Sequence, residues 1–125
     1  MIKVVIGIGS NCGDRKAKVE EGLEWLKSQL MQTKSSTIYE TPCALKAGKP
    51  YMNSVIFGYF SGDAFQLENL LKEKEESMGR DSECRKRGDV PIDMDIVICD
   101  NEIYKEWDYR QKFFRIGYEM LTQED

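Results

Sequence analysis

Four segments of the chain carry the hydrophobic pattern of β-strands. Residues 2–8 form a continuous, β-branched apolar run, which is typical of a buried central strand. Residues 33–40 are polar and prone to extended structure, which favours an outer strand. In residues 51–60, and again in residues 92–98, successive side chains alternate in character, so each segment presents two different faces.

Two further segments have the 3.6-residue periodicity of amphipathic helices. Asp14 stands at the N-cap position of the first helix, and Asp63 stands at that of the second. Gln66 lies three residues after Asp63, which predicts a capping box, and Gly79 is placed to end the second helix. Residues 103–125 are rich in aromatic side chains but show no firm periodicity. The two apolar stripes consist of Val19, Leu23, Leu26 and Leu30, and of Leu67, Leu70, Leu71 and Met78.

The predicted order is strand, helix, strand, strand, helix, strand. This is the order of the ferredoxin-like split βαβ arrangement, an α+β fold with an antiparallel sheet and helices on one face. A chain of 125 residues without an internal repeat or a linker is expected to form one domain, residues 1–125. Because this arrangement hosts many functions, it does not decide what the chain does.

Composition argues against several classes of protein. A formal net charge of −4 disfavours general nucleic-acid binding, and the basic cluster at residues 80–87 is too short to bind nucleic acid alone. No apolar run approaches the length of a membrane span. The chain has no histidine, which excludes catalytic relays that depend on one. The four cysteines form no CxxC pair and no signal peptide precedes them, so we expect reduced thiols and a cytoplasmic protein.

The candidate chemistry lies in residues 92–98. Asp93 and Asp95 point to the same face of the predicted strand, and the opposite face is expected to hold Ile92, Met94, Ile96 and Ile98. Two neighbouring carboxylates repel each other, and a hard divalent cation such as Mg²⁺ removes that cost. The alternative is a half-exposed edge strand whose two aspartates face water. The spacing by itself leaves both interpretations open, although aspartate is disfavoured in strands.

The loop before this strand favours the metal interpretation. Between Gly79 and Gly88 it contains the basic side chains Arg80, Arg85, Lys86 and Arg87. A cationic loop that leads into an Asp-x-Asp strand suggests that phosphate and metal are held close together.

Two other segments allow both a functional and a structural interpretation. The turn at residues 9–14 joins a strand to a helix, but it lacks the ending of a phosphate loop, and a glycine-dependent turn is favoured. Tyr51 and Asn53 lie two residues apart at the start of a strand, where they can stack on and hydrogen-bond a flat heterocycle. On these residues alone, simple packing by Tyr51 and a turn closed by Asn53 are favoured.

Several short motifs follow one another in a specific order. They are Ile8-Gly9-Ser10-Asn11, Tyr39-Glu40-Thr41-Pro42, Tyr51-x-Asn53, Glu75, Gly79-Arg80 and Asp93-Met94-Asp95-Ile96. In this order and at these spacings the chain, over roughly residues 3–104, resembles the 6-hydroxymethyl-7,8-dihydropterin pyrophosphokinase family. Enzymes of that family move pyrophosphate from ATP to a pterin alcohol in folate biosynthesis.

The resemblance implies a role for each matching residue. Asp93 and Asp95 would bind two Mg²⁺ ions that bridge the phosphates of ATP, and Arg80 would join them as a catalytic residue that reaches phosphate. The ATP side would also include Glu75, Arg87 and Arg115. The pterin side would consist of Thr41, Pro42, Leu45, Tyr51, Asn53 and Phe114, with Tyr51 stacking on the ring. The loops at residues 42–50 and 81–89 would close over the substrates.

The chain departs from the family pattern in two places. Where the family has a Gly-Pro-Arg type of segment, this chain has Gly88-Asp89-Val90, so an apolar side chain replaces an expected arginine and Asp89 adds negative charge nearby. The C-terminal part lacks the family's His-Tyr pair, and either Phe113 or Phe114 is the candidate for a second stacking ring. Arg87 and Arg115 are the candidates to compensate for the missing arginine.

Two hypotheses therefore stand. The first is a Mg²⁺- and ATP-dependent pyrophosphokinase, shortened at its C-terminus, whose activity is weakened by the loss of an arginine–phosphate contact. The second is a diverged, non-catalytic relative that binds a pterin or a nucleotide in a regulatory role.

Overall fold

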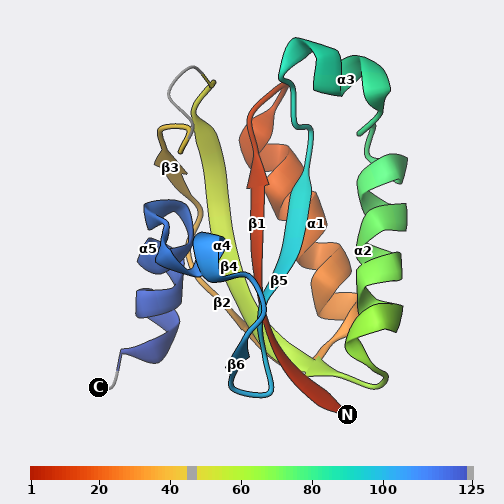
Figure 1. Ribbon diagram of the computed structural model, residues 1–125, viewed down its shortest axis with the longest axis vertical. Coiled ribbons are helices and arrows are strands. Elements are labelled where there is room, and N and C mark those ends of the chain that lie inside the picture. Colours follow the sequence, from red (N-terminus) through yellow and green to blue (C-terminus); the bar gives the residue numbers. More distant parts are fainter. Residues whose placement is uncertain (45–47, 124–125) are drawn as a thin grey trace.

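The computed structural model describes residues 1–44 and 48–123, and the strands within these residues form one antiparallel, six-stranded sheet (Figure 1). The hydrogen-bonded order is β2-β4-β1-β5-β6, and β3 pairs with β4 outside this path. The predicted α+β class with an antiparallel sheet is thereby confirmed. The strands are β1 (Ile2–Ser10), β2 (Met31–Ser35), β3 (Tyr39–Thr41), β4 (Tyr51–Phe60), β5 (Asp93–Cys99) and β6 (Glu102–Ile103).

Helices α1 (Arg15–Gln29) and α2 (Ala64–Ser77) begin where the sequence predicts. The side chain of Asp14 accepts a hydrogen bond of 3.1 Å from the backbone N–H of Ala17. At the second helix, the Gln66 N–H donates to Asp63 Oδ1 at 2.8 Å, and the Asp63 N–H donates to Gln66 Oε1 at 2.9 Å. The predicted capping box is therefore present.

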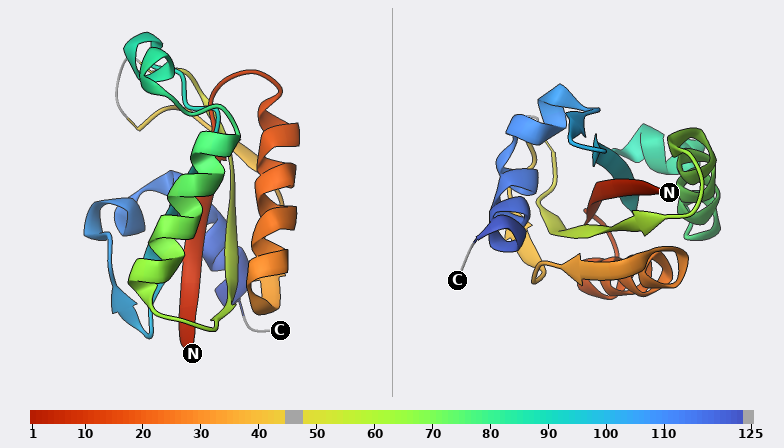
Figure 2. Two further views of the ribbon diagram at one scale, coloured as in Figure 1. Left: turned by 90° about the vertical axis from the view of Figure 1, so that its right-hand side faces the viewer. Right: turned by 90° about the horizontal axis from the view of Figure 1, so that it is seen from below.

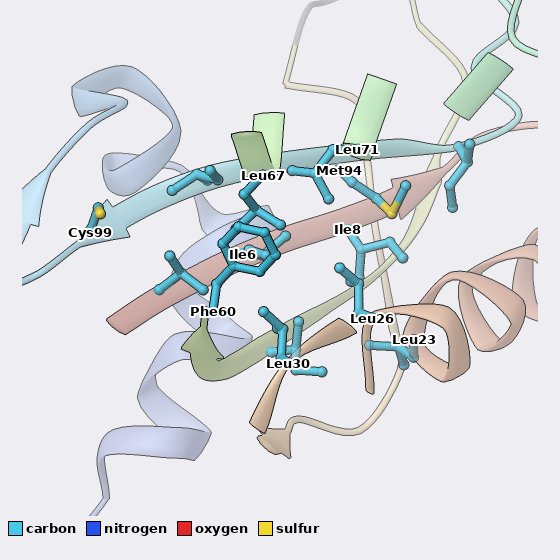
Figure 3. Packing of buried hydrophobic residues seen from close by; sticks show 14 of the residues in the cluster. Ile6, Ile8, Leu23, Leu26, Leu30, Phe60, Leu67, Leu71, Met94 and Cys99 are labelled. Atoms are coloured by element: carbon cyan, nitrogen blue, oxygen red, sulfur yellow. The ribbon is translucent and has the colours of Figure 1, made fainter. Parts of the chain in front are cut away.

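The larger hydrophobic core lies between these two helices and one face of the sheet (Figure 3). Leu26 of α1 and Leu67 of α2 are fully buried there, against Ile6 of β1 and Ile56 of β4. Both helices contribute the apolar stripes that their periodicity predicts, because side chains three and four residues apart share one face of a helix. The two long helices thus fix the position of the central strands β1, β4 and β5.

A smaller core lies on the opposite face of the sheet, beneath α4 (Glu106–Arg110) and α5 (Lys112–Thr122) (Figure 2). The expectation of helices on one face is therefore incomplete, since the C-terminal region supplies helices for the other. The buried residues of this core are Val5, Val55, Val97 and Phe114.

Helix α5 was not predicted from the sequence, because a glycine interrupts its apolar stripe. The stripe consists of Phe114, Gly117, Tyr118 and Leu121. A Cβ atom on Gly117 would lie 2.6 Å from Cγ2 of Val55, so only glycine lets the helix approach β4 this closely. The Tyr39 hydroxyl then holds the helix in place, since it donates to Phe113 O at 2.6 Å and accepts from the Gly117 N–H at 3.0 Å.

Three local expectations need correction. The strand predicted at residues 33–40 is divided into β2 and β3, because the backbone leaves β2 at Ser36, whose N–H donates to Val55 O. The basic loop contains a short helix, α3 (Ser82–Arg87). In β5 the pairing with β1 shifts register at a β-bulge, so both Val97 and Ile98 pack in the smaller core. Ile98 therefore does not share a face with Ile96.

Within residues 1–44 and 48–123, no helix is both long enough and apolar enough to cross a membrane. The cysteines Cys12, Cys43, Cys84 and Cys99 are free thiols in the structure.

Candidate functional site

Asp93 and Asp95 lie at the first residues of β5, opposite two glycines of β1. Asp93 pairs with Gly9, and Asp95 pairs with Gly7. Because Gly7 and Gly9 have no side chains, space is open beside the two carboxylates, which project from the same face of β5, as predicted. Both aspartates line two separate cavities. The pair of carboxylates therefore stands at the boundary between the cavities.

Each aspartate has one cationic partner among the described residues. Nη1 of Arg80 lies 2.8 Å from Oδ1 of Asp93, and Nζ of Lys105 lies 2.7 Å from Oδ1 of Asp95. Burial and the neighbouring charge of Asp95 raise the pKa of Asp93 well above its usual range, although 39% of the Asp93 side chain remains exposed. A further cation beside this pair would lower the cost of keeping both carboxylates ionised.

Glu75 connects α2 to this arrangement. Its Oε2 atom accepts hydrogen bonds from Nη1 of Arg80 at 3.0 Å and from the backbone N–H of Met94 at 2.8 Å. Burial raises the pKa of Glu75 despite these two donors. Glu75 thus orients the Arg80 guanidinium toward Asp93 and ties the end of α2 to β5.

The smaller cavity has a volume of about 310 Å³ and is bordered by aromatic and small side chains. Tyr51 and Asn53 of β4 line one side, and the Nδ2 atom of Asn53 donates to Oγ1 of Thr41 at 2.8 Å. Trp107 and Phe113 line the other side, with their ring centroids 5.9 Å apart. Such a cavity suits a flat ring that carries hydrogen-bonding groups at its edge.

The larger cavity has a volume of about 820 Å³ and is bordered by charged side chains of α2, α3 and β5. Its basic side chains are Lys72, Arg80, Arg85 and Lys105, and Glu75, Asp93 and Asp95 are among its acidic ones. Mixed charge of this kind suits a ligand that brings both anionic groups and a metal ion.

The structure brings together most of the residues that the sequence proposed. Around the two cavities it assembles Thr41, Pro42, Tyr51, Asn53, Glu75, Arg80, Asp93 and Asp95. Leu45 lies outside the described residues. Phe114 is fully buried in the smaller core, so it has no face free for a ligand, and Phe113 takes the place in the cavity that was expected of Phe114.

Arg87 and Arg115 do not line either cavity. Nε of Arg87 lies 2.9 Å from Oδ2 of Asp89, whose other carboxylate oxygen pairs with Lys49 from the loop before β4. Asp89 is therefore neutralised by two cations instead of adding free negative charge to the site. Arg115 stacks over the Tyr109 ring at 4.8 Å and pairs with Glu119 on the surface of α5. In this structure neither arginine lies beside the carboxylate pair.

The backbone around Val90 is held by the end of β1. The Val90 N–H donates to Oδ1 of Asn11 at 2.6 Å, the Asn11 N–H donates to Val90 O at 2.9 Å, and Nδ2 of Asn11 donates to Gly88 O at 3.0 Å. The turn after β1 thus serves as a clamp on the loop before β5. Gly13 in this turn has a φ of 67°, in the left-handed region that favours glycine, as a glycine-dependent turn requires.

Among the cavity residues that sequence reasoning missed are Lys105, Trp107 and Asp108. They follow the β6 turn, in a region without usable periodicity, and reach the site only because the Tyr104 N–H and the Lys105 N–H both donate to Val97 O. Burial and the charge of Asp95 raise the pKa of Asp108. In the sequence, the concentration of aromatic residues was the one feature which indicated that this segment packs over another part of the protein.

Asp93 and Asp95 are the side chains of this site that could hold a metal ion. Among the described residues, no group of three or more His, Cys, Asp or Glu side chains is arranged to hold a metal. Asp93 and Asp95 supply two carboxylates beside a cavity with basic walls. Two carboxylates fit Mg²⁺, which is commonly held by one or two of them together with substrate phosphates.

Comparison with known proteins gives one consistent result. The model of the family described as 7,8-dihydro-6-hydroxymethylpterin-pyrophosphokinase matches residues 5–121 of this chain. A 2-amino-4-hydroxy-6-hydroxymethyldihydropteridine pyrophosphokinase from Aquifex aeolicus is 30% identical over 126 residues, which cover 100% of this chain and 75% of the relative.

Other relatives are much longer proteins. A folate synthesis bifunctional protein from Arabidopsis thaliana is 34% identical over 97 residues, which cover 76% of this chain and 20% of the relative. A mitochondrial folate synthesis bifunctional protein from Pisum sativum is 31% identical over 97% of this chain and 23% of its own length. The chain therefore spans about a fifth to a quarter of the length of these bifunctional relatives.

Proposed function

Because the chain belongs to the 7,8-dihydro-6-hydroxymethylpterin-pyrophosphokinase family, we propose that it transfers pyrophosphate from ATP to 6-hydroxymethyl-7,8-dihydropterin in folate biosynthesis. The observation that carries this proposal is the meeting of two unlike cavities at Asp93 and Asp95. One cavity suits a flat heterocycle and the other suits a charged polyphosphate, so two substrates can meet at the carboxylates.

In the proposed reaction the pterin ring occupies the smaller cavity, between Tyr51 and the aromatic pair of Trp107 and Phe113. Asn53 stands at the edge of this cavity, where its amide can hydrogen-bond the ring. Holding the ring there directs its hydroxymethyl group toward the boundary between the cavities. Alignment of the two reactants supplies much of the rate enhancement in such a transfer.

ATP occupies the larger cavity, with its phosphates toward Arg80. The hydroxyl oxygen of the pterin attacks the β-phosphorus, and the bond from that phosphorus to the oxygen shared with the α-phosphorus breaks. AMP leaves with the shared oxygen and its electron pair, and the hydroxyl proton passes to solvent. Because the transition state spreads negative charge over several oxygens, the protein contributes mainly position and positive charge.

Asp93 and Asp95 would hold Mg²⁺ together with the phosphates. When bound, Mg²⁺ supplies positive charge to the phosphate oxygens and offsets the repulsion between the two carboxylates. Arg80, whose Nη1 atom lies 3.0 Å from Oε2 of Glu75 in this structure, would offer its guanidinium to the phosphates.

The test is an assay of AMP release from ATP in the presence of Mg²⁺ and 6-hydroxymethyl-7,8-dihydropterin. The proposal expects AMP formation that depends on both the pterin alcohol and the metal, with diphosphorylated pterin as the second product. ATP hydrolysis without pterin, or metal-dependent transfer to other alcohols at the same rate, would contradict it. Binding of both substrates without turnover would instead support the non-catalytic relative.

A further inference from the structure

Lys105 lies where the two cavities meet. Of the residues that the structure describes, Asp93, Asp95 and Lys105 are the ones that line both. Among the described residues, Lys105 is the one basic side chain that borders the smaller cavity. Its backbone N–H donates to Val97 O at 3.3 Å, which fixes the base of the side chain beside β5. A flexible four-carbon stem on a fixed base can present one charge to either cavity.

The site lacks a positive charge for phosphate at residue 90, where valine replaces the arginine that the family pattern predicts. Val90 offers nothing to phosphate, Arg87 is paired with Asp89, and Arg115 lies over tyrosine rings on the surface of α5. Of the described basic residues, Arg80 is the other one in direct contact with the carboxylate pair, and it is held by both Glu75 and Asp93. Lys105 has Asp95 as its ion-pair partner, and 47% of its side chain is exposed. Lys105 is therefore the less constrained of the two cations.

The ammonium group of Lys105 would have one role in the ligand-free site and another in the ligand-bound site. Without ligand, the ammonium group offsets the repulsion between Asp93 and Asp95. With a metal-bound polyphosphate in the site, Asp95 would help to hold the metal, and the ammonium group of Lys105 would be free to contact phosphate oxygens. An ammonium group binds phosphate well as a point charge, without the fixed geometry that an arginine needs.

We propose that Lys105 holds Asp95 in the ligand-free site and contacts the transferred phosphates when metal-bound ATP enters, supplying the charge that Val90 cannot. This inference rests on the proposed function, but its central claim concerns the polyphosphate and not the pterin. Lys105 forms no covalent bond and keeps its proton during the transfer. Its charge offsets the negative charge that develops on the phosphate oxygens.

The experiment measures the affinities for two ligands, which the proposal expects to change in opposite directions. In Lys105→Met, Mn²⁺ alone should bind about threefold tighter, because a positive charge that competes for Asp95 is gone. The Mg²⁺ complex of α,β-methylene-ATP should bind about tenfold more weakly, the change expected for one lost charge-assisted hydrogen bond. Mn²⁺ binding is followed by electron paramagnetic resonance, and nucleotide binding by calorimetry.

Two further variants serve as controls. Lys105→Arg keeps the charge and should restore most of the nucleotide affinity. Lys27→Met removes one lysine charge at the end of α1, far from the site in sequence and on another element, and should leave both affinities unchanged. If Lys105→Met does not fold, Lys105→Gln makes the same comparison.

Three results would overturn the proposal. If the nucleotide affinity of Lys105→Met stays within twofold of the wild-type value, Lys105 makes no contact with phosphate. A parallel loss of Mn²⁺ and nucleotide affinity would show that Lys105 only positions Asp95. Absence of metal–nucleotide binding in the wild-type protein would remove both the contact and the proposed function. In contrast, the expected opposite shifts without pterin-dependent AMP release would keep the role of Lys105 and reject the pterin as acceptor.

Discussion

The two cavities that meet at Asp93 and Asp95 are built by different physical means. The smaller one is bordered by residues whose shape is set by packing, such as Tyr51 on β4 and Phe113 at the start of α5. The larger one is bordered by charges that neutralise one another, such as Arg80 with Glu75 and Asp93. The packed side chains of the smaller cavity can accept a ligand without rearrangement. The ion pairs of the larger cavity must exchange partners when a charged ligand binds.

This difference indicates where each half of the site is vulnerable. Changes in the packed half should act through the docking of α5 and the shape of the cavity, with little dependence on salt. Changes in the charged half should act mainly through the binding of metal and phosphate, and where a pair is partly exposed, as for Lys105 and Asp95, they should have little effect on folding.

The largest effect is expected for Phe114, the residue that supports the packed half from below. Phe114→Ala should lower the free energy of unfolding by about 3–5 kcal/mol, because it empties the centre of the smaller core. Phe113→Ala should cost far less stability but should weaken pterin binding, since this ring faces the cavity. Urea unfolding and calorimetric titration of a pterin analogue separate the two. Equal loss of stability in both variants would contradict the assignment of the two rings.

In the charged half, Asp95→Asn should reduce kcat for AMP release by about 100-fold, or ~2.7 kcal/mol, because the charge of a proposed metal ligand is lost. Pterin-analogue binding measured without metal should remain within about threefold of wild type, which corresponds to less than 1 kcal/mol. Glu24→Gln on α1 is a matched control for the loss of one carboxylate. A variant as active as the wild type would remove Asp95 from the metal site.

Val90→Arg should raise kcat by about tenfold, or ~1.4 kcal/mol of barrier, because it adds a donor for the phosphates. The Asn11 clamp contacts the backbone of residue 90, so the new side chain need not disturb the loop. The gain should be larger in a Lys105→Met background, where the charge is missing. An equal gain in both backgrounds would mean that the two positions do not share one role. Asp89→Pro should not raise kcat, because Asp89 bridges Arg87 and Lys49 and its N–H donates to Cys84 O.

The smallest effect concerns Tyr39, which links α5 to the sheet through Phe113 O and the Gly117 N–H. Tyr39→Phe should lower the free energy of unfolding by about 1 kcal/mol at pH 8. Burial raises the pKa of Tyr39 from 10.0 to about 12 in the folded protein. The hydroxyl thus contributes its full stability below pH 10, and this is lost as the pH rises toward 12, because only the unfolded chain ionises at first.

The measurement is urea unfolding of wild type and Tyr39→Phe at pH 8 and pH 11. The difference between the two proteins should narrow at the higher pH. A difference that stays constant or widens would contradict the raised pKa of Tyr39.

Features that depend on near neighbours in the chain were predictable. The caps at Asp14 and Asp63 involve atoms no more than three residues away, and the alternation in β4 and the start of β5 sorts side chains to faces without any knowledge of partners. For the same reason the carboxylate pair of Asp93 and Asp95 was visible in the sequence, because two residues on one strand share a face wherever that strand lies.

Features that depend on contacts between residues far apart in the sequence became visible only in the tertiary structure. The choice between Phe113 and Phe114 depends on how α5 lies against Val55, which Gly117 permits at a distance that periodicity does not reveal. The cations of the site show the same limit. Arg87 matched the expectation by its place in the basic loop, yet Asp89 holds it, whereas Lys105 pairs with Asp95 from beyond the β6 turn. Charges act over short distances in space, and the sequence lists only distances along the chain.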